Sequence, residues 1–477
     1  MKKDWNICNS ALALYCITLV TFVFYRAYSL SLTHDEALSY FISKYSLLKI
    51  FTFDFNAPSN SHLLYTLLLK GVVALFGNSE IVLRLPALFG FLIYIFFAYT
   101  LSRKMFEKWT AIISFILLTA NPFIIDFFSL ARGYSLALGL LLATFYFAYQ
   151  SIYSEAKLKY TVYALLPGLL AAMANFAFTT PVIALWIGVG LISLIRAIHT
   201  SSYKQFFKQT LLPFIITFIP TYFFVLRPLL FLKEKNELYL GGNHSFVIDT
   251  IWGLVRTSLY DKQYFAYADV VIMVILVLVV VTAELLLVMA LKQKDSKTLR
   301  LLGFTFGVLA LTIIGVLAEN YIFNMPYVVE RAAIYFIPLF MLAFCSLING
   351  LKWGRYVGAI FALIALLHLS NSLNPNFTYN WKYDADTKAV VRDIDALHAE
   401  TKGQRETIVS EWLFDPSINY YSERRGISGL YWASDAEVAT SARYFLLLPF
   451  QKDVISKYNL RVIKEYPTSQ LTLAVRE

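Results

Sequence analysis

Long apolar segments recur along most of the chain, and short polar stretches separate them. A helix that crosses a lipid bilayer needs about 20 predominantly apolar residues. Eleven segments reach this length or come close to it, so each is predicted to form a transmembrane helix. They are residues 11–30, 85–103, 109–128, 132–150, 160–177, 179–197, 210–230, 269–291, 299–318, 332–349 and 354–372.

A twelfth apolar stretch, residues 62–76, is shorter than these segments and is interrupted by Lys70. A short apolar helix with a charged residue is typical of a helix that lies in the membrane interface. We therefore expect residues 62–76 to lie along the membrane surface without crossing it.

The positions of the basic residues predict the orientation of the chain. If the N-terminus is cytoplasmic, the loops 101–108, 151–159, 196–208, 292–300 and 350–355 are cytoplasmic and, with Lys2 and Lys3, hold sixteen Lys and Arg. The external loops up to residue 331 are longer and hold ten. This bias follows the positive-inside rule, and it would be inverted if residues 62–76 crossed the membrane.

The C-terminal segment, residues 373–477, differs from the rest of the chain in composition. Its first part is rich in charged residues, and short apolar runs follow at 407–410, 444–448, 460–463 and 471–475, with a helical pattern from Pro416 to Arg424 after Asp415 as N-cap. These features predict a small α/β domain of about 105 residues, which is large enough for its own core. Eleven crossings place this domain outside the cytoplasm, beyond a transmembrane domain of residues 1–372.

The composition agrees with an all-α polytopic membrane protein. Hydrophobic residues make up 58% of the chain and charged residues only 15%, whereas soluble proteins carry about 25% charged residues. A soluble enzyme and a disulfide-rich secreted domain are excluded. The net charge of +10 is spread between apolar segments, so nucleic acid is not an expected partner.

The first external loop, residues 31–84, carries two adjacent carboxylates, Asp35 and Glu36, directly after the first apolar segment. Such groups at the edge of a membrane are costly unless they are solvated, paired or used. One interpretation is a helix start with Thr33 as N-cap, at which both acids complement the helix dipole. The other is a functional site, because further polar residues recur at external membrane edges. These are Asn60, His62, Arg84, Asp126, Arg132, Tyr134, Glu330 and Arg331.

These residues stand in motifs that resemble the GT-C membrane glycosyltransferases, over about residues 1–350. The motifs are His34-Asp35-Glu36-Ala37, then Phe76-Gly77-Asn78-Ser79-Glu80, then Arg84-Leu85-Pro86, then Ser129 to Ser135, and finally Glu330-Arg331 with Pro338. They are most similar to the branch that contains protein O-mannosyltransferases and the lipid A aminoarabinose transferase (family 39/83-like).

The resemblance implies a glycosyltransferase of EC class 2.4 at the outer face of a bacterial inner membrane, with a polyprenyl-phosphate-linked sugar as donor. It implies Asp35 as the base and Glu36 as its helper, which holds an arginine or the acceptor. The donor phosphate is expected to bind Arg84, Arg331, Arg132 and Lys70, although Arg84 and Arg331 are also explained as anchors at the interface. The expected substrate-binding residues are His34, His62, Asn60, Asp126, Tyr134 and Glu330, and Asp126 is alternatively explained by a structural pair with Arg132.

Several alternatives stay open from the sequence. Relatives often carry two prolines before the interfacial helix, whereas this chain has Asn60-Ser61-His62. No cofactor is expected, and a divalent metal is not favoured because there is no closely spaced His or Cys cluster. A flippase for a lipid-linked saccharide, or a structural subunit of an envelope complex, would also explain the apolar segments. The sugar and the acceptor (a protein, a lipid such as lipid A, or a glycan) are not predicted.

Overall fold

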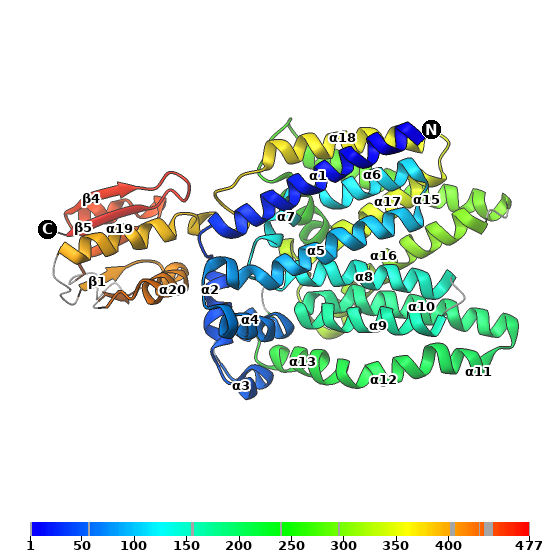
Figure 1. The fold of residues 1–477 in the computed structure, drawn as a ribbon, viewed down its shortest axis with the longest axis horizontal. Coiled ribbons are helices and arrows are strands. Elements are labelled where there is room, and N and C mark those ends of the chain that lie inside the picture. Colours follow the sequence, from blue (N-terminus) through cyan, green and yellow to red (C-terminus); the bar gives the residue numbers. More distant parts are fainter. Residues whose placement is uncertain are drawn as a thin grey trace.

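The computed structural model shows a bundle of long helices with a small α/β domain at one end (Figure 1). It describes residues 2–55, 58–153, 157–238, 241–293, 296–400, 406–428, 430–433 and 442–476. The N-terminus lies at the opposite end of the bundle from the C-terminal domain, as an odd number of crossings requires. We call these two ends of the bundle the domain end and the far end.

All eleven segments predicted to cross the membrane form helices. The elements of the bundle are α1 (Lys2–Ser29), α5 (Glu80–Met105), α6 (Lys108–Thr119), α7 (Pro122–Phe128), α8 (Tyr134–Tyr153), α9 (Lys157–Ala174), α10 (Thr179–Thr200), α11 (Tyr203–Phe206), α12 (Leu212–Thr221), α13 (Arg227–Glu234), α14 (Gly253–Leu259), α15 (Ala268–Gln293), α16 (Ser296–Phe323), α17 (Phe336–Gly350) and α18 (Gly354–Ser372). Short π-helical turns join α11, α12 and α13 into one helical stretch, Tyr203–Glu234.

By length and composition, eight helices among the described residues can cross a membrane. A ninth crossing is formed if α6 and α7, which are bent by 65° at residues 120–121, count as one. The two other predicted crossings correspond to α9 and α17. By length and composition, neither is among the helices that can cross a membrane, and α17 has only 15 residues. Both are nevertheless part of the bundle, because α9 packs along α8 and α17 packs between α16 and α18.

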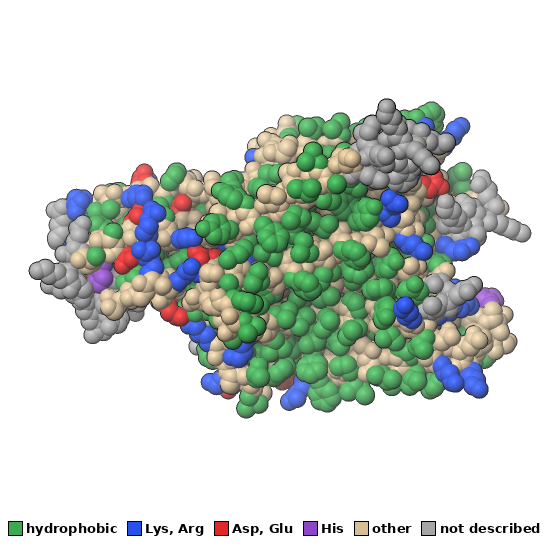
Figure 2. All heavy atoms as spheres, viewed as in Figure 1, with side chains coloured by type: hydrophobic (Ala, Val, Ile, Leu, Met, Phe, Trp, Pro, Cys, Tyr) green, Lys and Arg blue, Asp and Glu red, His purple; other side chains and the backbone are tan. Residues whose placement is uncertain are grey.

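The face of the bundle seen in Figure 2 is largely apolar between its two ends. Helix α15 is the extreme case. Its most apolar stretch of 18 residues has a mean hydropathy of 3.2, and only 6% of that stretch is buried inside the protein. A helix this apolar and this exposed requires lipid around it. The chain is therefore an integral membrane protein.

A close contact between α5 and α8 forms the centre of the bundle. A Cβ atom on Gly90 would lie 2.5 Å from the backbone of Leu136, and one on Gly139 would lie 2.5 Å from the carbonyl oxygen of Gly90. Small residues at such crossings allow helix backbones in membranes to approach closely. This contact fixes the loop that precedes α8 against the N-terminal half of α5.

Three short helices follow α1 at the domain end: α2 (His34–Ser43), α3 (Leu47–Thr52) and α4 (Leu63–Phe76). Helix α4 matches the stretch predicted to lie in the interface, and at 14 residues it is too short to span. It packs against α2, α5 and α9. The C-terminal domain lies directly over α2 (Figure 1).

The C-terminal domain has the predicted α/β character, with a five-stranded sheet where four strands were predicted. Its strands, β1 (Glu406–Val409), β2 (Leu430–Ala433), β3 (Tyr444–Leu447), β4 (Leu460–Glu465) and β5 (Thr472–Arg476), stand in the order β2-β1-β3-β5-β4. β2, β1 and β3 are parallel, and β5 is antiparallel to both β3 and β4. Its helices are α19 (Thr387–Glu400), α20 (Asp415–Arg425) and α21 (Asp453–Lys457).

Two details of the predicted domain needed correction. Asp415 is the first residue of α20 and Phe414 is its N-cap, because a short 3₁₀ turn at Trp412–Phe414 leads directly into the helix. Strand β2 and helix α19 were not predicted, since the first has only four residues and the second has a strongly polar exposed face. A 3₁₀ turn, Tyr379–Asp384, links α18 to α19 and packs against the bundle.

Candidate active site

Helix α2 begins with a capping box at the domain end. The Thr33 hydroxyl accepts a hydrogen bond from the Glu36 backbone N–H, and a Glu36 carboxylate oxygen accepts one from the Thr33 N–H at 2.9 Å. This reciprocal arrangement satisfies N–H groups that a helix start leaves without partners. The predicted N-cap role of Thr33 is confirmed, and Asp35 and Glu36 lie in the first turn of α2.

The Glu36 side chain forms a fully buried ion pair with Arg84 of α5. The Arg84 Nε donates to one Glu36 carboxylate oxygen at 2.8 Å and a terminal nitrogen donates to the other at 2.9 Å; both side chains are 0% exposed. The remaining Arg84 donors bind the carbonyl oxygens of Ala27, Leu30 and Ser31. One interaction therefore joins the end of α1, the start of α2 and the start of α5.

This geometry corrects the predicted role of Arg84. A guanidinium group has five N–H donors, and in Arg84 the five are used by Glu36 and by the carbonyl oxygens of Ala27, Leu30 and Ser31. No donor is left for a phosphate, so Arg84 is a structural residue. Glu36 also accepts a hydrogen bond from the Ala131 N–H, and thus it holds an arginine and the loop before α8.

Asp35, the neighbouring carboxylate, has a different environment. Terminal nitrogens of Arg132 and Arg331 each lie 3.6 Å from its Oδ2. This is longer than the 2.7–2.9 Å of a charge-assisted hydrogen bond. Oδ2 is buried and has no hydrogen-bond partner among the described residues. Burial alone would raise the pKa of Asp35, but the charges of Arg132 and Arg331, aided by a hydrogen bond from Trp381, outweigh burial and lower it.

The Arg132 guanidinium is held in place by hydrogen bonds from one of its two terminal nitrogens. One of its terminal nitrogens donates to the backbone oxygens of Asp35 and Asn60 and to the Ser39 hydroxyl. Its Nε is buried without a hydrogen-bond partner among the described residues. The guanidinium is thus fixed in orientation but keeps an unused donor beside the Asp35 carboxylate.

His62 adds another buried atom without a partner to this cluster. Its Nε2 is buried and unpaired among the described residues, and its ring packs edge-on against Tyr134 at 5.5 Å. Burial and the nearby charges of Arg132 and Arg331 lower the pKa of His62 well below its usual value, so the ring is neutral. Gly133 is required beside it, because a Cβ there would lie 1.8 Å from the Ala174 carbonyl oxygen.

Arg331 reaches Asp35 from the segment before α17. Its side chain is 29% exposed, and its guanidinium lies over the Trp381 ring at 4.9 Å. Its neighbour Glu330 has a φ of 44° and accepts a hydrogen bond from the Asn380 side chain. The turn Tyr379–Asp384 therefore supports Arg331, and Trp381 joins the site directly.

The structure places three of the predicted site residues away from this cluster. Asp126 forms an ion pair with Arg26 of α1 at 2.7 Å and accepts hydrogen bonds from the Tyr260 hydroxyl and the Tyr379 N–H. It is saturated and does not pair with Arg132, so neither of its predicted roles is retained. Lys70 donates to the carbonyl oxygens of Ser43 and Tyr45, where it caps the C-terminal end of α2. The third, His34, lies beside the C-terminal domain, with its Nδ1 bonded to the Leu413 carbonyl oxygen at 2.8 Å.

Sequence reasoning missed two residues of the turn after α18. Trp381 contacts Asp35 and Arg331, and Asp384 accepts hydrogen bonds from the His34 N–H at 2.7 Å and from the hydroxyls of Thr387 and Ser417. In the sequence these two residues are an aromatic residue and an acid that follow shortly after the last apolar segment. Nothing in their spacing indicates that they fold back to α2.

Asp35, Arg132, Arg331, Asn60 and His62 thus meet at the domain end, with Tyr134 and Glu330 at the edge of the cluster. Within the described ranges, no three His, Cys, Asp or Glu side chains are grouped in a way that would hold a metal ion. The fold and the cluster define a polytopic membrane protein with one buried carboxylate between two guanidinium groups, at the junction of the bundle and its C-terminal domain.

No protein-family model matches the chain, and no characterised protein sequence matches it significantly. Two solved structures are similar to it along nearly their whole length. The crystal structure of ArnT from Cupriavidus metallidurans bound to undecaprenyl phosphate gives a TM-score of 0.48 at 12% identity, over 98% of each chain. The apo state of the same protein gives 0.42 at 12% identity, over 100% of this chain and 98% of that one. We therefore infer function from the side chains of the cluster.

We predict that Glu36→Gln and Arg84→Gln strongly destabilise the protein, because each leaves a buried charge without its partner. Breaking such a pair costs about 3–5 kcal/mol. Lys44→Gln is the matched control, since the Lys44–Glu423 pair joins the end of α2 to α20 but is about 40% exposed and is worth ~1 kcal/mol or less. Thermal unfolding of the purified proteins would show this order; equal, small shifts in all three variants would contradict it.

We also predict that Asp384 makes stability depend on pH. Burial raises its pKa to about 7, whereas an unfolded aspartate titrates near ~3.9. The folded state binds this proton more tightly, so its contribution to stability is full below pH ~4 and is lost as the pH rises through about 7. Asp384→Asn should match the wild-type melting temperature near pH ~4 and exceed it by an increasing margin as the pH rises toward about 7. Parallel melting curves for both proteins between pH 5 and pH 8 would contradict this assignment.

Proposed function

We propose that this protein is a GT-C-type glycosyltransferase that moves a sugar from a polyprenyl-phosphate carrier to an acceptor hydroxyl or phosphate. The observation that carries the proposal is the buried Oδ2 of Asp35, which lies between two arginines without a hydrogen bond from any residue that the structure describes. An ionised carboxylate that is not locked in a pair is available to take a proton. Its lowered pKa keeps it ionised at neutral pH.

Arg132 and Arg331 are the groups that we assign to the donor phosphate. Both are close enough to Asp35 to act on the same substrate, and neither forms a short ion pair with it. The unpartnered Nε of Arg132 and the partly exposed guanidinium of Arg331 offer donors to phosphate oxygens. Positive charge fixed where negative charge develops stabilises the leaving group.

The reaction that we propose needs one base and no general acid. With a hydroxyl acceptor, its oxygen forms a bond to the anomeric carbon while the bond from that carbon to the phosphate oxygen breaks. The hydroxyl proton goes to Asp35, and the electron pair of the broken bond remains on the polyprenyl phosphate, beside Arg132 and Arg331. Attack on the face opposite the leaving phosphate inverts the configuration of the sugar. With a phosphate acceptor, the acceptor oxygen is already ionised and Asp35 has no proton to remove.

His62, Asn60 and Tyr134 complete the proposed substrate site. The neutral ring of His62 has an unpartnered Nε2, which can donate to or accept from a sugar hydroxyl or the acceptor. We place the site at the outer face of the inner membrane, since the basic loops predicted to be cytoplasmic lie at the far end. The acceptor stays open between a protein, a lipid and a glycan, and independence from metal remains a prediction.

We predict that Asp35→Asn lowers donor turnover with a hydroxyl acceptor by about 10²–10⁴-fold, the range attributed to a general base. Wild type and variant would be purified in detergent and supplied with lipid and envelope extract, and released polyprenyl phosphate would be followed by mass spectrometry. Asp54→Asn is the matched control, because Asp54 is an exposed acid in the same loop. It should keep wild-type turnover.

Unchanged melting temperatures would show that the loss in Asp35→Asn is chemical. If wild type released no polyprenyl phosphate with any acceptor present, the transferase proposal would be rejected. Movement of an intact lipid-linked saccharide across vesicles, unaffected by Asp35→Asn, would support a transporter instead.

A further inference from the structure

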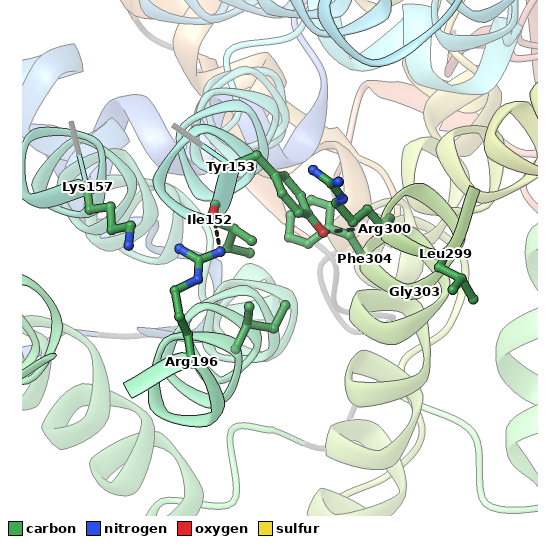
Figure 3. Close-up of a pocket in the computed structure, with 9 residues that line it drawn as sticks. Ile152, Tyr153, Lys157, Arg196, Leu299, Arg300, Gly303 and Phe304 are labelled. Carbon is green, nitrogen blue, oxygen red and sulfur yellow. Dashed lines mark hydrogen bonds between the residues drawn. The ribbon is translucent and has the colours of Figure 1, made fainter. Parts of the chain in front are cut away.

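A cavity of about 810 Å³ lies at the far end of the bundle (Figure 3). It opens between the end of α8, the start of α9, the last turns of α10 and the start of α16. Helix α8 has 20 residues from Tyr134, in the candidate active site, to Tyr153, in this cavity. At 1.5 Å per residue the two regions are about 30 Å apart. The cavity is therefore not a part of the catalytic cluster.

Cationic side chains from three helices line this cavity: Lys157 of α9, Arg196 of α10 and Arg300 of α16. Figure 3 shows Lys157 and Arg196 directed toward one another. The like charges of Lys157 and Arg196 repel one another at this position, and an anion bound between them would relieve that repulsion.

The guanidinium of Arg196 is positioned by the protein. It donates one hydrogen bond to the Ile152 carbonyl oxygen at 2.6 Å, which holds it at the C-terminal end of α8. The Tyr153 hydroxyl donates to the Arg300 carbonyl oxygen at 3.1 Å and fixes the aromatic wall of the cavity. Residues of several helices thus form the site, and it does not consist of a single flexible lysine at the surface.

The other walls are apolar, with Ile192, Leu299 and Phe304 beside the cations. A cavity that joins a basic pocket to an apolar wall at the end of a membrane helix bundle fits a lipid phosphate better than a free anion. The headgroup lies at the level of the helix ends, and an acyl chain extends along the helices. Basic pockets between helices on the cytoplasmic side of membrane proteins bind anionic headgroups in this way.

We propose that this far-end cavity, with Lys157 and Arg196 as its phosphate-binding cations, binds the phosphate headgroup of an anionic phospholipid of the inner leaflet. Lys157 and Arg196 contact the phosphate oxygens, and the Ile192 and Phe304 side chains contact the first part of an acyl chain. The bound lipid holds the ends of α8, α9, α10 and α16 together. This site is independent of the proposed sugar transfer at the domain end.

The test uses the full-length protein in detergent and measures retained lipid by native mass spectrometry. Phosphatidylglycerol, phosphatidylcholine, a polyprenyl phosphate and inorganic phosphate are the probes. Removal of a basic residue near a headgroup costs about fivefold in affinity, so Lys157→Gln and Arg196→Gln should each weaken phosphatidylglycerol binding about fivefold. Arg196→Lys keeps the charge and should restore most of it.

Lys204→Gln is the matched control, since Lys204 of α11 is an exposed cation at the same end but outside the cavity. It should bind phosphatidylglycerol as wild type does, and all these variants should retain donor turnover. Three results would each overturn the proposal: equal retention of phosphatidylcholine and phosphatidylglycerol, an equal loss in Lys204→Gln, or full competition by inorganic phosphate at the same concentration. Preferential retention of polyprenyl phosphate, lost in Arg196→Gln, would also overturn it, because the cavity would then be a carrier-lipid site.

Discussion

The buried pair between Glu36 and Arg84 is the interaction on which the domain end depends. It joins α2 to α5, and the remaining Arg84 donors bind three carbonyl oxygens at the end of α1. Glu36 also receives the Ala131 N–H, so the loop that carries Arg132 is tied to the same carboxylate. Two charges without water are costly, and here each is compensated by several short hydrogen bonds. The position of Asp35, one residue earlier on α2, follows from this arrangement.

Two adjacent carboxylates therefore have opposite roles that their surroundings define. Glu36 accepts every hydrogen bond its oxygens can use, and its arginine contacts are 2.8–2.9 Å. Asp35 has its arginines at 3.6 Å and an oxygen without a partner. Environments that separate two neighbouring acids in this way are a recurring basis of acid–base chemistry in enzymes. In this protein the saturated acid builds the site, and the unsaturated one is the group that we propose as the base.

Much of the fold could be predicted from periodicity and composition. The eleven apolar segments are helices, residues 62–76 form the short helix α4, and the tail is an α/β domain. The Asp35, Arg132 and Arg331 cluster was also predicted, because all three residues lie at the same edge of the membrane. The partner of each charge could not be predicted. Arg84 meets Glu36 and Asp126 meets Arg26 through helix packing across 48 and about 100 residues of chain, which local pattern does not encode. Trp381 enters the site only because the C-terminal domain folds back over α2.

The two ends of the bundle divide the cations into two sets, which we assign to different lipid phosphates. Arg132 and Arg331 face a carboxylate at the domain end, whereas Lys157 and Arg196 face one another at the far end. The most direct test of the account is an experimental structure of Asp35→Asn with a polyprenyl phosphate. The account predicts phosphate oxygens within hydrogen-bonding distance of Arg132 Nε and the Arg331 guanidinium, next to residue 35. The polyprenyl phosphate bound in the far-end cavity, or at the domain end away from both arginines, would contradict it.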